Sequence, residues 1–97
     1  MSGYGIRVII SGNVQGVAYR AWAASKADEL ALNGWIRNLS DGTVEAVFAG
    51  DRAVVEAMLE ECEVGPLNAR VEKVDRHVLD GDELKEIEDG FYTRASI

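Results

Sequence analysis

The sequence predicts an α+β fold of the ferredoxin-like, split βαβ type (βαββαβ), with one antiparallel sheet and two helices on one of its faces. Three observations support this fold class. The 97 residues suffice for a single domain, residues 1–97. Apolar residues recur with period two or near 3.6 in the order strand, helix, strand, strand, helix, strand. Only two Trp, two Phe and three Tyr are present, so the core must be mainly aliphatic.

The first strand and the first helix are joined by a loop that begins and ends with glycine. Residues 6–11 are rich in β-branched side chains and place Ile6, Val8 and Ile10 on one face, which predicts a strand. Residues 12–16, Gly-Asn-Val-Gln-Gly, predict the loop. A helix is predicted from 19 to 32, and Asn33-Gly34 is the expected end of this helix. One face of the helix carries a stripe of four apolar side chains: Tyr19, Ala23, Ala27 and Leu30.

A hairpin is predicted next. Residues 35–38 form a short second strand, and residues 39–42 end in Asp-Gly, a strong turn signal. Residues 43–49 alternate, with Val44, Ala46 and Phe48 on one side. These features predict two neighbouring antiparallel strands.

The second half of the chain predicts a helix and further strands. Asp51 is the expected N-cap of a helix that ends at Gly65-Pro66 and buries one apolar stripe: Val55, Met58, Leu59 and Cys62. Residues 69–79 predict a strand with a bulge between Val71 and Val74, where the alternation lapses. The acidic residues 80–89 predict a solvated loop, and residues 91–94 a last edge strand.

The net charge of −7 is unevenly distributed. Residues 1–50 contain four basic and four acidic side chains, whereas residues 51–97 contain six basic and thirteen acidic ones. An acidic chain is a poor match for nucleic acid or for an anionic membrane surface, so neither is an expected partner. A small anionic substrate would meet the least repulsion at the first half of the chain.

Cysteine usage and hydropathy indicate a reducing compartment. Cys62 is the single cysteine, so it can form neither an internal disulfide nor a thiolate metal cage. No N-terminal apolar run and no stretch of about 18 apolar residues is present. We therefore expect a cytoplasmic protein.

Residues 12–20 are the segment with the most chemical information. A helix N-terminus leaves backbone N–H groups without partners and favours an anion. Gly12 and Gly16 would let the backbone curl around it, and Arg20 would add a planar set of donors suited to phosphoryl oxygens. The alternative is an ordinary turn followed by a surface arginine. No Gly-Lys-Ser/Thr follows, so the segment is not a Walker loop.

Two motifs resemble the acylphosphatase family. Residues 12–20, Gly-Asn-Val-Gln-Gly-Val-Ala-Tyr-Arg, resemble its signature Gly-x-Val-Gln-Gly-Val-x-Phe-Arg. Residues 34–38, Gly-Trp-Ile-Arg-Asn, followed by Asp-Gly-Thr-Val at 41–44 and by Gly50, resemble its second signature. Tyr19 replaces a usual Phe or Met, and Ile36 a usual Val or Ala.

The resemblance implies hydrolysis of acyl phosphates to a carboxylate and inorganic phosphate, with no metal and no cofactor. By matched position, Arg20 would bind the phosphoryl group and Asn38 would position the attacking water. Backbone amides would complete the phosphate site, contributed by Gln15, Gly16, Val17, Ala18, Tyr19 and Arg20. The expected partner is a small acyl phosphate, and the expected state is a monomer, since a domain of this size can fold alone.

Other interpretations remain open at this point. Asn38 could be a turn residue that caps its own backbone. The chain could also keep the fold but serve as a non-catalytic accessory or regulatory module that binds phosphate. An RNA-binding sheet would need basic residues and stacking aromatics on its central strands, and the third strand offers only Phe48.

The remaining polar and aromatic residues are expected to be structural. Arg37 points to the opposite face of the strand from Asn38, so we expect it to be a solvated charge. Asp41 and Glu45 are expected to be turn and surface residues. His77 is the lone histidine and has no Cys or His neighbour. Trp35 would flank the core or shape the acyl pocket.

Overall fold

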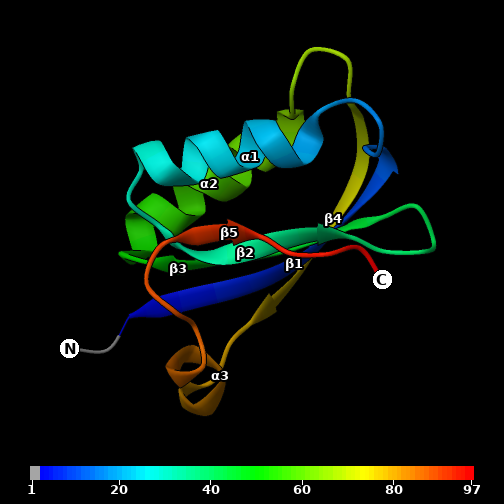
Figure 1. The fold of residues 1–97 in the computed structure, drawn as a ribbon. Helices are drawn as coiled ribbons and strands as arrows, with labels where there is room; N and C mark the ends of the chain where they lie inside the picture. Colours follow the sequence, from blue (N-terminus) through cyan, green and yellow to red (C-terminus); the bar gives the residue numbers. More distant parts are fainter. Residues whose placement is uncertain (1–2) are drawn as a thin grey trace.

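The computed structural model describes residues 3–97. The elements follow in the order β1 (Tyr4–Asn13), α1 (Tyr19–Glu29), β2 (Asn33–Asn38), β3 (Val44–Gly50), α2 (Arg52–Val64), β4 (Arg70–Val78), α3 (Gly81–Lys85) and β5 (Phe91–Thr93). The strands form one sheet in the order β4-β1-β3-β2-β5. Figure 1 shows α1 and α2 side by side on one face of the sheet and α3 on the other. The predicted ferredoxin-like arrangement is confirmed.

The sheet is mixed rather than antiparallel throughout, which corrects one part of the prediction. The four longer strands pair antiparallel, but β5 pairs parallel with β2. The reason is the path of the chain after β4. It leaves one edge strand, crosses the sheet through α3 and reaches the opposite edge where β2 begins (Figure 1). It therefore enters β5 in the direction of β2.

The core lies between the sheet and the two long helices. The predicted inward side chains of β1 and β3 are all buried: Ile6, Val8, Ile10, Val44, Ala46 and Phe48. The predicted stripe of α2 is buried in full, from Val55 to Cys62. In α1 the prediction is wrong at Leu30, which is 36% exposed, because the helix ends at Glu29 and Ala31 turns the backbone to a positive φ.

The two predicted irregularities of the β4 region had different outcomes. The bulge is confirmed: pairing with β1 passes from Ser11–Lys73 to Gly12–Val71, so Glu72 is left without a partner. The solvated loop at 80–89 is wrong. Asp80 and Glu83 form a capping box, each side chain accepting from the backbone N–H of the other, and this begins the short helix α3.

Strand β3 is buried on both faces. Its side chains on the helix side belong to the core, and on the other face Glu45 is bound by two arginines while Val47 and Ala49 are 4% and 7% exposed. Glu45 is only 5% exposed, so the prediction of a surface residue is wrong. Two arginines on the neighbouring strands cover it, as described below.

Candidate active site

The loop of residues 14–18 lies between β1 and α1 and forms one wall of a pocket of about 290 Å³. Of the predicted site residues, six line this pocket: Gln15, Gly16, Ala18, Tyr19, Arg20 and Asn38. Arg20 lies in the first turn of α1 and Asn38 ends β2, so the fold brings together two side chains that are 18 positions apart in the sequence. Both are partly buried.

Four further features of the pocket differ from the sequence prediction. Val17 does not line it, and its side chain packs against the core instead. Val14, Ala21 and Thr93 line it and were not predicted. Val14 belongs to the first motif and Ala21 follows it, but Thr93 is brought in by the pairing of β5 with β2, beside Ile36.

Positive φ angles curl the loop. Gly16 has φ +75°, and Ala18, the residue before α1, has φ +64°. Gly16 has open space where a side chain would stand. Two left-handed residues within three positions bend the backbone sharply, and turns that include left-handed residues are where anion-binding nests form.

The N-terminus of α1 has no protein cap. Ala18 occupies the N-cap position and offers no side-chain acceptor, and the first turn contains no acidic residue. Within residues 3–97, no acceptor receives a hydrogen bond from the N–H groups of residues 15–20. A helix end with free donors and an uncompensated dipole attracts an anion.

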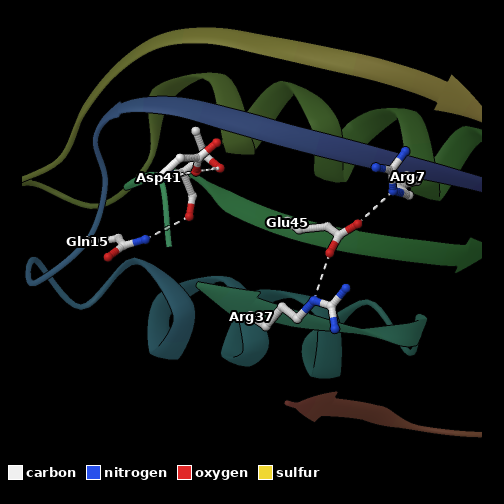
Figure 2. A network of polar contacts seen from close by, with 6 residues as sticks. Arg7, Gln15, Arg37, Asp41 and Glu45 are labelled. Atoms are coloured by element: carbon white, nitrogen blue, oxygen red, sulfur yellow. Dashed lines mark hydrogen bonds and ion pairs between the residues drawn. The ribbon is translucent and has the colours of Figure 1, made fainter. Parts of the chain in front are cut away.

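Gln15 ties the loop to the hairpin turn that follows Asn38. Its side-chain Nε2 donates to the carbonyl oxygens of Leu39 and Thr43, both at 2.8 Å. Figure 2 shows the carboxamide reaching from the loop to this turn. The turn is itself closed by Asp41, whose Oδ1 accepts from the N–H and the hydroxyl of Thr43. Gln15 therefore fixes the distance between the loop and the end of β2.

Asp41 is confirmed as a turn residue. The hydrogen bonds from Thr43 lower the pKa of its carboxyl, so it is ionised at neutral pH. It does not line the pocket. Asn38 differs from a self-capping turn residue, because in the described chain its carboxamide makes no hydrogen bond and only its carbonyl oxygen accepts, from the N–H of Ile97. The carboxamide is available to a bound molecule.

Tyr19 connects the first turn of α1 to α2. Its ring is 1% exposed, and its hydroxyl donates to the carbonyl oxygen of Cys62 at 2.7 Å. Burial raises the pKa of Tyr19 well above its ordinary value and raises the pKa of Cys62 to about 12. Neither group exchanges a proton near neutral pH, so both are structural. The next residue, Arg20, is thereby held on a fixed turn.

The opposite face of the sheet carries an ion-pair cluster of Arg7, Glu45 and Arg37. Glu45 accepts from Nε of Arg7 and from Nε of Arg37, each at 2.7 Å (Figure 2). Burial alone would raise the pKa of Glu45, but the two hydrogen bonds and the two guanidinium charges outweigh it and lower the pKa. The prediction of a solvated Arg37 is therefore wrong. Trp35 lies on this face too, under the Arg37 guanidinium at 5.0 Å, and does not line the pocket beside the 14–18 loop.

His77, predicted to be structural, is exposed on β4 with Nε2 at 3.6 Å from Glu83. Within residues 3–97, no group of three or more His, Cys, Asp or Glu side chains is placed to hold a metal ion. In the same described range, no helix combines the length and the apolar composition that crossing a membrane requires.

Comparison with known proteins identifies relatives along nearly the whole chain. The family model described as acylphosphatase matches residues 6–92. An acylphosphatase of Rhodopseudomonas palustris is 50% identical over 78 residues, 80% of this chain and 79% of that protein. An acylphosphatase of Haloarcula marismortui is 47% identical over 90% of this chain and 91% of its own. The solved structure of an acylphosphatase from Coxiella burnetii superposes with a TM-score of 0.83 at 37% identity, over 95% of this chain and 93% of that one.

Proposed function

The chain belongs to the acylphosphatase family and hydrolyses acyl phosphates, and we propose that Arg20, Asn38 and the amides of the 15–20 loop perform this reaction without a metal ion. The observation that supports the assignment is that both side chains line one pocket at the uncapped N-terminus of α1, which we call the catalytic pocket.

The chemistry of the substrate explains why so few groups suffice. An acyl phosphate releases a carboxylate, whose conjugate acid has a pKa of roughly 4, so the leaving group departs without a general acid. The transition state at phosphorus is loose, and negative charge lies on the non-bridging oxygens. Catalysis then requires that these oxygens be held and that a water molecule be aimed in line.

Each part of the pocket has a role in this scheme. The guanidinium of Arg20 and the free N–H groups of the loop donate to the phosphoryl oxygens, and the helix dipole favours their charge. The carboxamide of Asn38 both accepts and donates, so it can orient a water molecule toward phosphorus. The phosphoryl group itself accepts the proton of the water. We propose this last step because no carboxylate or histidine lines the described pocket.

The decisive experiment measures hydrolysis of benzoyl phosphate in EDTA. Arg20→Ala, Arg20→Lys and Asn38→Ala should each lower kcat/KM by about 100-fold or more, since a lost donor to a charged transition state costs on this order. Arg20→Lys is included because a point charge does not replace two parallel donors. Matched controls are Arg52→Ala and Asn68→Ala, both exposed and outside the pocket.

Three results would reject the assignment. Wild-type rates in both Arg20→Ala and Asn38→Ala, with folding unchanged, would move the site elsewhere. Loss of activity in EDTA with recovery on adding a metal would overturn the metal-free scheme. A pH–rate profile set by an enzyme carboxylate would overturn the role of the substrate as proton acceptor. p-Nitrophenyl phosphate should react little, because its leaving group, p-nitrophenolate, is poorer than a carboxylate.

We also propose that residues 1–97 act as one domain and as a monomer in the cytoplasm. A single cluster of buried residues links the sheet with α1 and α2, and the one cysteine is buried as a reduced thiol. Sedimentation equilibrium should give a mass near 10.6 kDa at assay concentrations. A mass of twice that value would reject the monomer.

A further inference from the structure

A second pocket, of about 210 Å³, lies on the face of the sheet that α1 and α2 do not cover. We call it the α3 pocket, because α3 and the residues after it form one wall. The cross-strand row Arg7, Val47 and Trp35 forms the sheet wall, since these residues are register partners on β1, β3 and β2. It is separated from the catalytic pocket by the thickness of the sheet.

The floor of the α3 pocket is apolar. Val47 and Leu79 are 4% and 8% exposed, and Ile87 and Trp35 are partly buried beside them. Gly5 allows this arrangement, because a β-carbon there would stand 2.7 Å from a methyl group of Leu84 and 3.0 Å from one of Leu79. An apolar body of a ligand would gain by covering this floor.

Two arginines on the pocket wall have free donors. Within residues 3–97, no carboxylate lies at ion-pair distance from Arg94, whose guanidinium stands over the ring of Trp35 at 4.3 Å. Arg7 donates its Nε to Glu45, and its terminal NH₂ groups have no acceptor in the described chain. Stacking on Trp35 restrains the guanidinium group of Arg94. Arg94 therefore loses less conformational entropy when it binds an anion.

Two glutamates on the opposite wall select the charge of the ligand. Glu83 and Glu86 line the pocket on the α3 side, and Oε1 of Glu83 already accepts from the N–H of Asp80. Their charges would repel a dianion such as a phosphate ester more strongly than a monoanion. A planar monocarboxylate also matches the paired donors of a guanidinium.

We propose that the α3 pocket binds a small organic monocarboxylate, with its carboxylate on Arg94 and Arg7 and its apolar body against Val47, Leu79 and Ile87. The inference is independent of the proposed catalytic assignment, because it uses residues of the other face of the sheet. It assigns a second, non-catalytic ligand site to the molecule.

The two tryptophans allow a direct test with benzoate as the probe. Trp35 lines the α3 pocket, whereas Trp22 packs against Tyr19 near the catalytic pocket, with ring centroids 5.4 Å apart. Their indole N–H signals are followed by ¹H–¹⁵N NMR, with saturating inorganic phosphate present to occupy the catalytic pocket. Trp35 should shift to saturation, with a dissociation constant on the order of 1 mM for a ligand this small.

Variants and analogues separate the parts of the site. Arg94→Gln should weaken benzoate binding at least tenfold, and Ile87→Ser should weaken it as well, which simple ion pairing with a surface arginine would not predict. Arg52→Gln is the matched control, because Arg52 also stands over an aromatic ring, that of Tyr4, but outside the pocket. Benzamide, without the charge, and acetate, without the ring, should both bind more weakly than benzoate.

Three results would overturn the proposal. One is a Trp35 shift that grows linearly with benzoate and never saturates. Another is an equal response to benzamide. The third is a shift of Trp22 instead of Trp35 when the titration is repeated without phosphate, if Arg20→Ala abolishes that shift, since this would place the acid in the catalytic pocket.

Discussion

At Ala18 the loop requires a left-handed backbone conformation, which a residue with a β-carbon adopts only at a cost in free energy. The φ of Ala18, +64°, lies in the left-handed region, which costs a residue with a β-carbon about 1–2 kcal/mol. The same conformation starts α1 without a side-chain cap and leaves the loop N–H groups free. The strain and the missing cap both lower stability, and the missing cap leaves the helix N-terminus open to an anion.

Ala18→Gly tests the strain directly. Glycine removes the left-handed penalty but adds freedom to the unfolded chain, so we expect a net gain of about 0.5–1 kcal/mol in the free energy of unfolding. The backbone N–H remains, so kcat/KM should change little. Urea denaturation and benzoyl phosphate assays give the two values. A loss of stability would show that the observed backbone does not strain Ala18.

Gln15 is a positioning residue, because its side chain holds the turn that follows Asn38 against the loop. Gln15→Met keeps the length of the side chain but removes the donor to Leu39 and Thr43. The loop and the end of β2 would then lose their fixed spacing. We expect kcat to fall about 10- to 100-fold, because a small misplacement of the water-orienting group has a large effect on rate.

The phosphate inhibition constant distinguishes this role from damage to the loop. Phosphate contacts only the loop and Arg20 in the proposed scheme, so its inhibition constant should stay within about threefold in Gln15→Met. Equal loss of phosphate affinity and of kcat would instead assign Gln15 to the anion-binding set. Circular dichroism spectra and urea midpoints check that the variant is folded.

At the scale of the elements, two glycines of the first motif have different reasons to be glycine. Gly12 lies at the β1–β4 bulge with φ +125°, and a β-carbon there would stand 2.1 Å from the carbonyl oxygen of Arg70. Gly16 has φ +75° and no neighbour within 4 Å of the position that a β-carbon would take. Gly12 therefore belongs to strand pairing, and Gly16 to the curl of the loop.

Alanine at each position should separate these roles. Gly12→Ala sets a side chain against backbone that cannot move aside, so we expect a loss of about 3 kcal/mol or more in the free energy of unfolding. Gly16→Ala meets only the left-handed penalty, about 1 kcal/mol. Thermal and urea denaturation of both variants give the comparison. Equal losses would contradict the distinction.

The elements also show what the sequence could predict. Strands β1 and β3 and helix α2 follow patterns within one segment, and their buried faces were predicted residue by residue. The capping box of α3 was readable too, because Asp80 and Glu83 have the spacing of an N-terminal helix signal, but the density of acidic residues suggested a loop.

Contacts between residues on different elements could not be predicted from the sequence. Glu45 is buried because Arg7 and Arg37 approach it from two other strands, 38 and 8 positions away. The side chain of Gln15 donates to backbone carbonyl oxygens. Because every residue has such a carbonyl group, the sequence does not indicate which residues Gln15 contacts. Thr93 reaches the catalytic pocket only because β5 runs parallel to β2.

On the scale of the whole molecule, no acidic side chain of the described residues 3–97 lines the catalytic pocket, although the chain has a net charge of −7. Except for Thr93, every residue that lines this pocket comes from positions 14–38, within the half of the chain whose charges sum to zero. The excess acids lie on α2, β4 and α3 and in the segment that follows α3. An anionic substrate therefore meets no carboxylate among the described lining residues of the pocket, while the acidic surface of the molecule disfavours nucleic acid.

Glu45 joins three strands of the sheet through one carboxylate, so its ionisation should set part of the acid stability of the whole molecule. Glu45→Gln removes the charge that Arg7 and Arg37 share. Arg7 is 42% exposed and solvent screens it, so we expect a loss of about 1–2 kcal/mol at pH 7, below the value for a fully buried pair. Glu60→Gln, an exposed acid, is the matched control.

The pH dependence follows from the lowered pKa of Glu45. In the unfolded chain the carboxyl has its ordinary pKa of 4.5, and in the folded protein the pKa is lower, so the unfolded state binds the proton first. The stabilisation is fully present above pH 4.5 and is lost as the pH falls toward the folded value. Urea denaturation of wild type and Glu45→Gln should show a gap that narrows below pH 4.5, because protonation makes the two side chains alike. A gap that stays constant or widens in acid would mean that the carboxylate charge does not stabilise the sheet.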